Sequence, residues 1–176
     1  MVSKQQLPKD PQRLIDLARD STTSQETLDA VADVGLPFLW EYVAQNASVS
    51  PHTLAKLTPR KLSSETDLRA AAAVAHAVRS PAEALQRLVE LVPPDCLNGA
   101  RREQGGYVAL FRALAEHPNT PAGVLASTLR SCRIAKRLRL DIAASTCHRT
   151  VLEVLAEDPV EAVRLVATRR LADSVG

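Results

Sequence analysis

One twelve-residue pattern recurs along this chain of 176 residues, and it constrains the fold more than any other feature. Each copy opens with an aliphatic residue and alanine, continues through a polar turn, and closes on a leucine eleven residues after its opening. The four full copies are LARDSTTSQETL (17–28), VAQNASVSPHTL (43–54), VAHAVRSPAEAL (74–85) and LAEHPNTPAGVL (114–125). Shorter copies open at Ile142 and Val166. Self-similarity of this kind is typical of a repeat protein built from one recurring structural unit.

The recurring unit predicts a helix, a tight turn and a second helix. A capping side chain stands directly before proline at five places, and this pair favours the first residues of a helix. The five pairs are Asp10 with Pro11, Ser50 with Pro51, Ser80 with Pro81, Thr120 with Pro121, and Asp158 with Pro159. After the caps, aliphatic residues three apart, such as Leu54 and Leu57, share one helix face. We expect that face to form the contact between neighbouring units.

The sequence therefore predicts an all-α fold. Aromatic residues make up 3% of the chain, which disfavours a β-sandwich, and no strand is expected. The predicted helices cover 11–20, 24–33, 37–46, 51–57, 66–79, 81–92, 106–117, 121–130, 132–145, 148–157 and 160–171. Gly35, followed closely by Pro37, predicts that one helix stops and the next begins there.

A segment near the middle of the chain, 93–106, predicts a loop or hinge. It contains two prolines and three glycines and has no apolar periodicity. We expect it to join two repeat halves, 11–92 and 107–172, within a single helical-repeat domain that spans 1–176. One half alone is expected to have little core, because repeats are stabilised by their neighbours.

The repeated unit resembles the leucine-rich repeat variant, a relative in shape of HEAT and armadillo repeats. The resemblance rests on the aliphatic-Ala opening, the cap-Pro pair and the following x-x-Leu-x-x-Leu, and LAEHPNTPAGVLASTL (114–129) is the closest single match. This copy departs from the pattern at its end, where Thr128 takes the second leucine position and Leu129 follows it. LAEDPVEAVRLVATRR (155–170) looks like the Asp-Pro and Val-Arg form of the same unit. The resemblance implies a right-handed α-α superhelix (solenoid) of about five to six short repeats, without intrinsic catalytic residues. The family's founding type carries an iron–sulfur cluster held by cysteines near its N-terminus, and no cysteine precedes Cys96 here, so that feature is not expected.

The cysteines and histidines do not have the spacing of a metal site. Cys96, Cys132 and Cys147 form no C-x₂₋₄-C pair, and the four histidines form no H-E-x-x-H motif. We therefore expect reduced thiols, no metal and no cofactor. No apolar run approaches the ~20 residues of a membrane span, and the first residues lack the apolar core of a signal peptide, which predicts a cytoplasmic protein without membrane contact.

Positive charge concentrates in the C-terminal part of the chain. Residues 1–100 hold 10 basic and 12 acidic side chains, whereas 101–176 hold 12 basic and 8 acidic ones. The densest group, which we name the cation cluster, consists of Arg130, Arg133, Lys136, Arg137 and Arg139. On the predicted helix 132–145 these cations lie opposite an apolar stripe. Arg101 and Arg102 extend the cluster if the fold brings them to the same side. A solvated helix face is the simpler interpretation, and binding of phosphate or an acidic partner is the alternative.

The only tryptophan, Trp40, lies among alternating aromatic residues. Phe38, Trp40 and Tyr42 cannot share one face of a helix, so part of this aromatic surface is expected to be exposed. We favour Trp40 as a wedge that fills space between repeats, with a contact residue at a binding surface as the alternative.

Together these features predict a non-enzymatic scaffold that binds another protein. A nucleic-acid-binding, HEAT-like protein using the arginines around Arg133 is the alternative. A HEAT-like base-excision glycosylase, which would depend on Trp40 and Glu41, ranks last. The identity of the partner and the oligomeric state are left open by the sequence.

Overall fold

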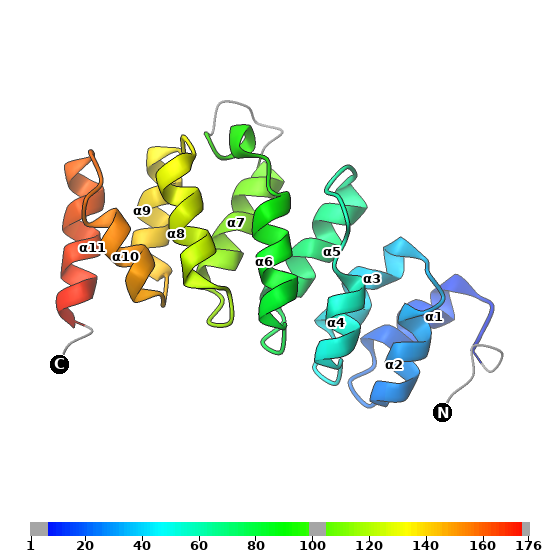
Figure 1. Ribbon diagram of the computed structural model, residues 1–176. Coiled ribbons are helices and arrows are strands. Elements are labelled where there is room, and N and C mark those ends of the chain that lie inside the picture. Colours follow the sequence, from blue (N-terminus) through cyan, green and yellow to red (C-terminus); the bar gives the residue numbers. More distant parts are fainter. Residues whose placement is uncertain (1–6, 99–104, 174–176) are drawn as a thin grey trace. The chain divides into compact units, whose positions relative to one another are not determined.

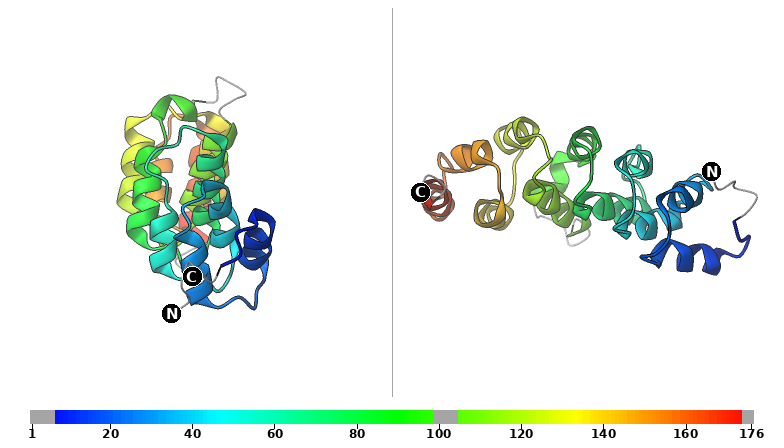
Figure 2. Two further views of the ribbon diagram at one scale, coloured as in Figure 1. Left: turned by 90° about the vertical axis from the view of Figure 1, so that its right-hand side faces the viewer. Right: turned by 90° about the horizontal axis from the view of Figure 1, so that it is seen from below.

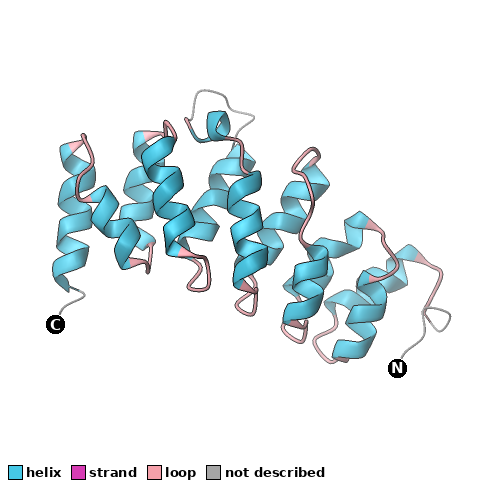
Figure 3. Cartoon of the chain, viewed as in Figure 1, coloured by secondary structure: helices cyan, strands magenta, loops and turns pink. Residues whose placement is uncertain are grey.

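The computed structural model describes residues 7–98 and 105–173 (Figure 1). Within these ranges the chain consists of helices joined by loops and turns, without a strand (Figure 3). The predicted all-α class is therefore confirmed.

The chain divides into two compact units, 1–88 and 89–176. Their boundary falls inside α6, ahead of the segment 93–106 that was predicted to be a loop or hinge. That prediction is wrong in part, because 94–97 form a 3₁₀ helix and 105 and 106 begin α7, while 99–104 lie outside the described residues. The described helices of the first unit are α1 (Pro11–Arg19), α2 (Gln25–Ala32), α3 (Pro37–Gln45), α4 (Pro51–Leu57), α5 (Glu65–His76) and most of α6 (Ala82–Leu91). Those of the second unit are the end of α6, the 3₁₀ helix η2 (Pro94–Leu97), α7 (Gly105–Glu116), α8 (Ala122–Ser131), α9 (Lys136–Ser145), α10 (Arg149–Leu155) and α11 (Glu161–Asp173).

The first unit packs its helices in two rows. Helices α1, α3 and α5 contact one another in chain order, with α3 against α5 as the most extensive contact, while α2 packs on α4 (Figure 2). The predicted helix faces form the core, because Leu28, Leu54 and Leu57 are almost completely buried. Burial of these aliphatic side chains is the main force that holds the rows together.

The second unit repeats this arrangement. Helices α7, α9 and α11 form one row, and α8 packs on α10, which also contacts α11 (Figure 2). Phe111 and Leu125 are fully buried in its core. Within each unit, the odd-numbered helices therefore form a row.

The predicted caps explain where several helices begin. The side chains of Asp10 and Ser50 accept hydrogen bonds from backbone N–H groups in the first turns of α1 and α4, at 3.0 Å each, and Ser24 does so at α2. Thr120 does not cap α8, because its buried hydroxyl has no hydrogen-bond partner within the described part of the chain. The structure adds a capping box that we had not predicted, at Ser64 and Asp67 before α5.

The stop between α2 and α3 is also confirmed. Gly35 has a φ of 79°, in the left-handed region that glycine adopts without strain, and Pro37 begins α3.

The start of α9 differs from the prediction of a helix over 132–145. Helix α9 begins at Lys136, and residues 132–135 are not helical. The N–H of Ala135 donates to the Leu97 carbonyl at 2.8 Å. This bond ties the segment to η2 and keeps it out of the helix, a long-range effect with no local signal. Arg133 consequently lies in a loop instead of on the helix.

Candidate functional site

The cation cluster lies where α8 ends and α9 begins. Arg130 is in the last turn of α8, Arg133 in the following loop, and Lys136 and Arg137 in the first turn of α9; all four are exposed. Arg101 and Arg102 lie outside the described residues, so their predicted contribution is not placed.

The local fold explains why these cations face solvent. Ile134, Leu138 and Ile142 are at most 3% exposed and form the predicted apolar stripe. Because this face of α9 packs against the core, the helical periodicity places Lys136 and Arg137 on the opposite, solvent-facing side.

Arg139 departs from the rest of the cluster. Its Nε lies 3.1 Å from Oδ2 of Asp158, and the two side chains are 19% and 5% exposed. Asp158 also accepts the N–H of Val160 at 2.8 Å, ahead of α11. Because a buried carboxylate requires a compensating cation, Arg139 links α9 to the turn between α10 and α11. Its solvent-facing placement in the sequence analysis is corrected by this ion pair.

A pocket of about 320 Å³ opens beside the cluster in the second unit. Arg130, Cys132, Arg139, Glu157 and Asp158 are among the residues that line it. The Arg139–Asp158 pair neutralises itself, so Arg130 and Glu157 are the remaining charges of the lining.

The first turn of α9 is electrostatically unusual. It has no side-chain cap at Ala135 and no acidic residue, yet it carries Lys136, Arg137 and Arg139. The N-terminal end of a helix carries partial positive charge, which acidic side chains usually offset. Cations at this end repel that charge, so the arrangement favours an anionic partner at the expense of helix stability.

Most other described arginines of the second unit have partners inside the chain. The pairs are Arg112 with Glu116 at 4.0 Å, Arg149 with Glu153 at 3.1 Å, and Arg164 with the Asp158 carbonyl at 2.8 Å. Arg170 donates to the carbonyls of Ala144 and Thr146. Among the described residues, Arg130, Arg133, Lys136 and Arg137 have no such ion pair or hydrogen bond, and this separates them from an evenly neutralised helix face.

Trp40 belongs to the first unit. It is half-buried in α3, and its indole Nε1 is buried without a hydrogen-bond partner among the described residues. Phe38 is the exposed aromatic, at 40%, and Tyr42 lies beneath the Arg19 guanidinium at 4.6 Å. The half-buried side chain and buried Nε1 of Trp40 favour a packing role over a contact role at a binding surface.

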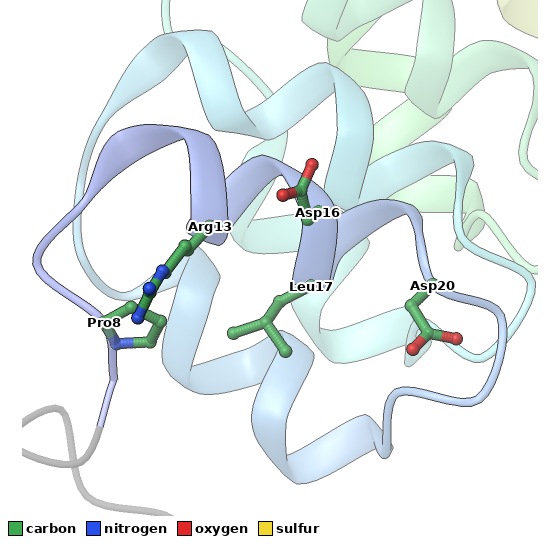
Figure 4. A pocket seen from close by; sticks show the side chains of 5 residues that line it. All are labelled: Pro8, Arg13, Asp16, Leu17 and Asp20. Carbon is green, nitrogen blue, oxygen red and sulfur yellow. The ribbon is translucent and has the colours of Figure 1, made fainter.

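A second pocket, of about 320 Å³, lies along α1 in the first unit. Figure 4 shows the side chains of Arg13, Leu17 and Asp20 spread along it, without converging on one point. Asp16 accepts from Gln12 and Asp20 from Thr22, so both carboxylates are held by neighbours on their own segment. Nothing in this pocket brings an acid, a base and a nucleophile together.

A set of polar side chains that was not predicted from the sequence joins successive turns. Asn46, at the end of α3, donates to the carbonyls of Ala18 and Asp20 at 2.9 Å each. Thr146, at the end of α9, donates to the carbonyl of Ala115 at 2.7 Å. The only sequence signal was the polar turn that follows each aliphatic-Ala opening.

Cys147 and His148 also serve these turns. His148 Nε2 lies 3.0 Å from the carbonyl of His117, so this nitrogen carries the proton and donates. The Sγ of Cys147 lies 3.6 Å from the carbonyl of Glu116. Both side chains therefore contact the preceding turn of the second unit.

Within the described ranges, no group of three or more His, Cys, Asp or Glu side chains is placed to hold a metal ion. None of the helices in those ranges combines the length and apolar character that crossing a bilayer requires. No protein-family model matches the sequence, and no curated protein or solved structure matches it. The resemblance to leucine-rich repeat variants stays a prediction.

Proposed function

We propose that this chain is a non-enzymatic helical-repeat scaffold that binds another protein, and that the bound surface of the partner is acidic. Two-row packing of short helices leaves loops and helix ends exposed, and repeat proteins commonly use such surfaces for docking. The proposal includes a right-handed superhelix of about five to six repeats of the leucine-rich-repeat-variant kind.

The observation that supports the proposal is the group of four exposed cations at the α8–α9 junction. Arg130, Arg133, Lys136 and Arg137 lie within eight residues of sequence and have no intramolecular anion in the described chain. Unpaired surface charge of one sign attracts a partner of the other sign and accelerates its association.

A nucleic acid is the second candidate partner, and the start of α9 favours it. An uncapped helix N-terminus flanked by cations offers both N–H donors and positive charge to a phosphate. The two candidates differ in how binding responds to salt and in which polyanion binds.

Fluorescence anisotropy separates them. Labelled probes are an Asp/Glu-rich peptide, duplex DNA and single-stranded RNA, each titrated with the full chain at low and moderate salt. We expect the peptide to bind, and the double variant Arg133→Glu, Arg137→Glu to abolish binding. The matched control is Arg60→Glu, Lys61→Glu, which makes the same change of charge at exposed positions in the first unit.

The outcomes are distinct. Binding of DNA or RNA alone, with an affinity that falls steeply as salt rises, would favour the nucleic-acid candidate. If no probe binds at low salt, or if the control variant loses as much affinity as the cluster variant, the cluster is a solvated face and the proposal fails. Emission from Trp40 verifies that each variant is folded.

A further inference from the structure

Helix α11 of the second unit has one face that is open to solvent. Its buried residues, Val163 and Ala167, belong to the side that packs on α9 and α10. Figure 1 shows both of these helices on the same side of α11. The opposite face of α11 presents Leu165, whose side chain is 63% exposed.

The repeat shows what is different about this face. Leu114, Ile142 and Val166 open three successive copies and occupy equivalent positions in the row of α7, α9 and α11. Leu114 and Ile142 are completely buried, whereas Val166 is only half-buried. The residue before each opening follows the same trend, since Ala113 is 4% exposed and Leu165 is 63% exposed. Helices α7 and α9 are each followed in the row by another helix that packs on them, and α11 is followed by none in the described chain.

Opposite charges flank Leu165 on this face. Glu161 and Arg169 lie four residues before and four residues after it, so the three side chains form one stripe along the helix. Both charged residues are exposed, and neither makes an ion pair or a side-chain hydrogen bond within the described residues. We name these three residues the α11 stripe; in chain order it is acidic, apolar and basic.

We infer that the α11 stripe binds the α11 stripe of a second copy of this chain, with the two helices antiparallel. A twofold axis at Leu165 places the two leucines against each other and Glu161 of each copy opposite Arg169 of the other. A parallel arrangement would instead place like charges opposite each other. The order of the three residues is therefore self-complementary, and a second copy satisfies both charges while it covers the exposed leucine.

The contact is small, because it joins one helix of 13 residues to its copy. Interfaces below the standard size are weak, so we expect a dissociation constant on the order of 100 µM. This inference goes beyond the proposed function. It involves neither the cation cluster nor an acidic partner, and the chain alone is sufficient to test it.

Sedimentation equilibrium of the full chain is the first test. We expect the average mass to rise from monomer toward dimer between about 10 µM and about 500 µM, a range that brackets the expected dissociation constant. Leu165→Asp places two like charges at the twofold axis and should keep the chain monomeric over this range. The matched control is Val78→Asp, the same kind of change at an aliphatic side chain of the first unit that is 80% exposed, and it should leave dimerisation unchanged.

Charge reversal tests the antiparallel arrangement. Glu161→Arg makes both charged positions of the stripe basic, and Arg169→Glu makes both acidic, so each variant alone should stay monomeric. An equimolar mixture of the two variants should form a heterodimer, because every facing pair again has opposite signs. Circular dichroism verifies that each variant is folded, and the mixture decides the question even if Leu165→Asp does not fold.

Three results would overturn the inference. The first is a chain that stays monomeric at the highest concentration. The second is a folded Leu165→Asp variant that still dimerises, or a Val78→Asp variant that loses as much association. The third is a mixture of the two charge variants that remains monomeric, which would exclude the antiparallel pairing of Glu161 with Arg169.

Discussion

The two units differ in how their helices begin, although α3 in the first unit also lacks a side-chain cap. In the first unit, α1, α2, α4 and α5 all begin with a side-chain cap from Asp10, Ser24, Ser50 or Ser64. In the second unit, α8, α9 and α10 begin without one. Bonds between turns, which satisfy carbonyls at the other ends of the helices, occur in both units: Thr146, His148 and Arg170 join the turns of the second unit across 24 to 31 residues, and Asn46 joins those of the first across 26 and 28 residues.

This difference separates local from non-local order. A cap acts within four residues, and the capping residue directly precedes its helix in the sequence. A bond between turns requires that two distant turns already lie side by side. The helix starts of the first unit are thus more locally encoded than those of the second, and the second unit leaves the start of α9 open to an external anion.

The largest test of the comparison removes one buried leucine from each unit. Leu54 and Leu125 are both fully buried, so Leu54→Ala and Leu125→Ala should each cost about 2–5 kcal/mol by leaving a cavity. Hydrogen exchange should show loss of protection mainly in the unit that carries the change. Equal loss in both units would mean that they unfold together and would break the division; a cost near zero would mean that the repeat register is wrong.

The bonds between turns are tested by a matched pair of threonines. Both hydroxyls are buried, but Thr146 donates to Ala115 whereas Thr120 has no partner in the described chain. Thr146→Val should cost about 1–3 kcal/mol, because a buried acceptor loses its donor, and Thr120→Val should be neutral or stabilising. Urea unfolding of both variants measures the change in the free energy of unfolding. Equal changes would contradict the view that the bonds between turns stabilise the second unit.

The capping of the first unit predicts sensitivity to acid. Burial tends to raise the pKa of Asp67, but hydrogen bonds from Ser64 and Ser63 outweigh it and hold the pKa below its ordinary value of 3.8. A lowered pKa in the folded state adds stability that is complete above pH 3.8 and is lost as the pH falls through the folded-state pKa. Because Asp67 is only half-buried, the contribution is at most about 1 kcal/mol.

Thermal unfolding between pH 6 and pH 2 measures this effect. Asp67→Asn should lower the Tm at pH 6 and show a smaller further loss below pH 3.8 than the unchanged chain. A parallel loss in both proteins would show that the capping box adds nothing to acid sensitivity.

The smallest expected effect concerns the uncapped start of α9. Lys136→Glu places an acidic side chain in the first turn and should raise the stability of the second unit by about 0.3–1 kcal/mol. The same change should weaken binding of the acidic peptide. A variant that becomes less stable would show that Lys136 has a structural role and would undermine the assignment of the cluster to binding.

Helix positions were predictable because their signals are local. The cap-Pro pairs located the starts of α1 and α4, and Gly35 located the break before α3. The prediction failed at α9, where a bond from Ala135 to Leu97 holds the preceding segment out of the helix. No residue near position 132 signals that contact.

The density of positive charge in the sequence predicted the cation cluster, and the contacts in the structure corrected the placement of one of its members. Charge density alone indicated the cluster, and the stripe of Ile134, Leu138 and Ile142 oriented it. The pairing of Arg139 with Asp158 was not predictable, because the partners approach only when α9 packs against the α10–α11 turn.

The sequence by itself determined that this protein is helical, where most helices begin, and which leucines are buried, since capping and helical periodicity act within a few residues. Tertiary structure alone decided which polar side chains join the turns, which arginine is neutralised, and where α9 begins. Those outcomes depend on the meeting of segments that are far apart in the chain, and a local pattern carries no information about such a meeting.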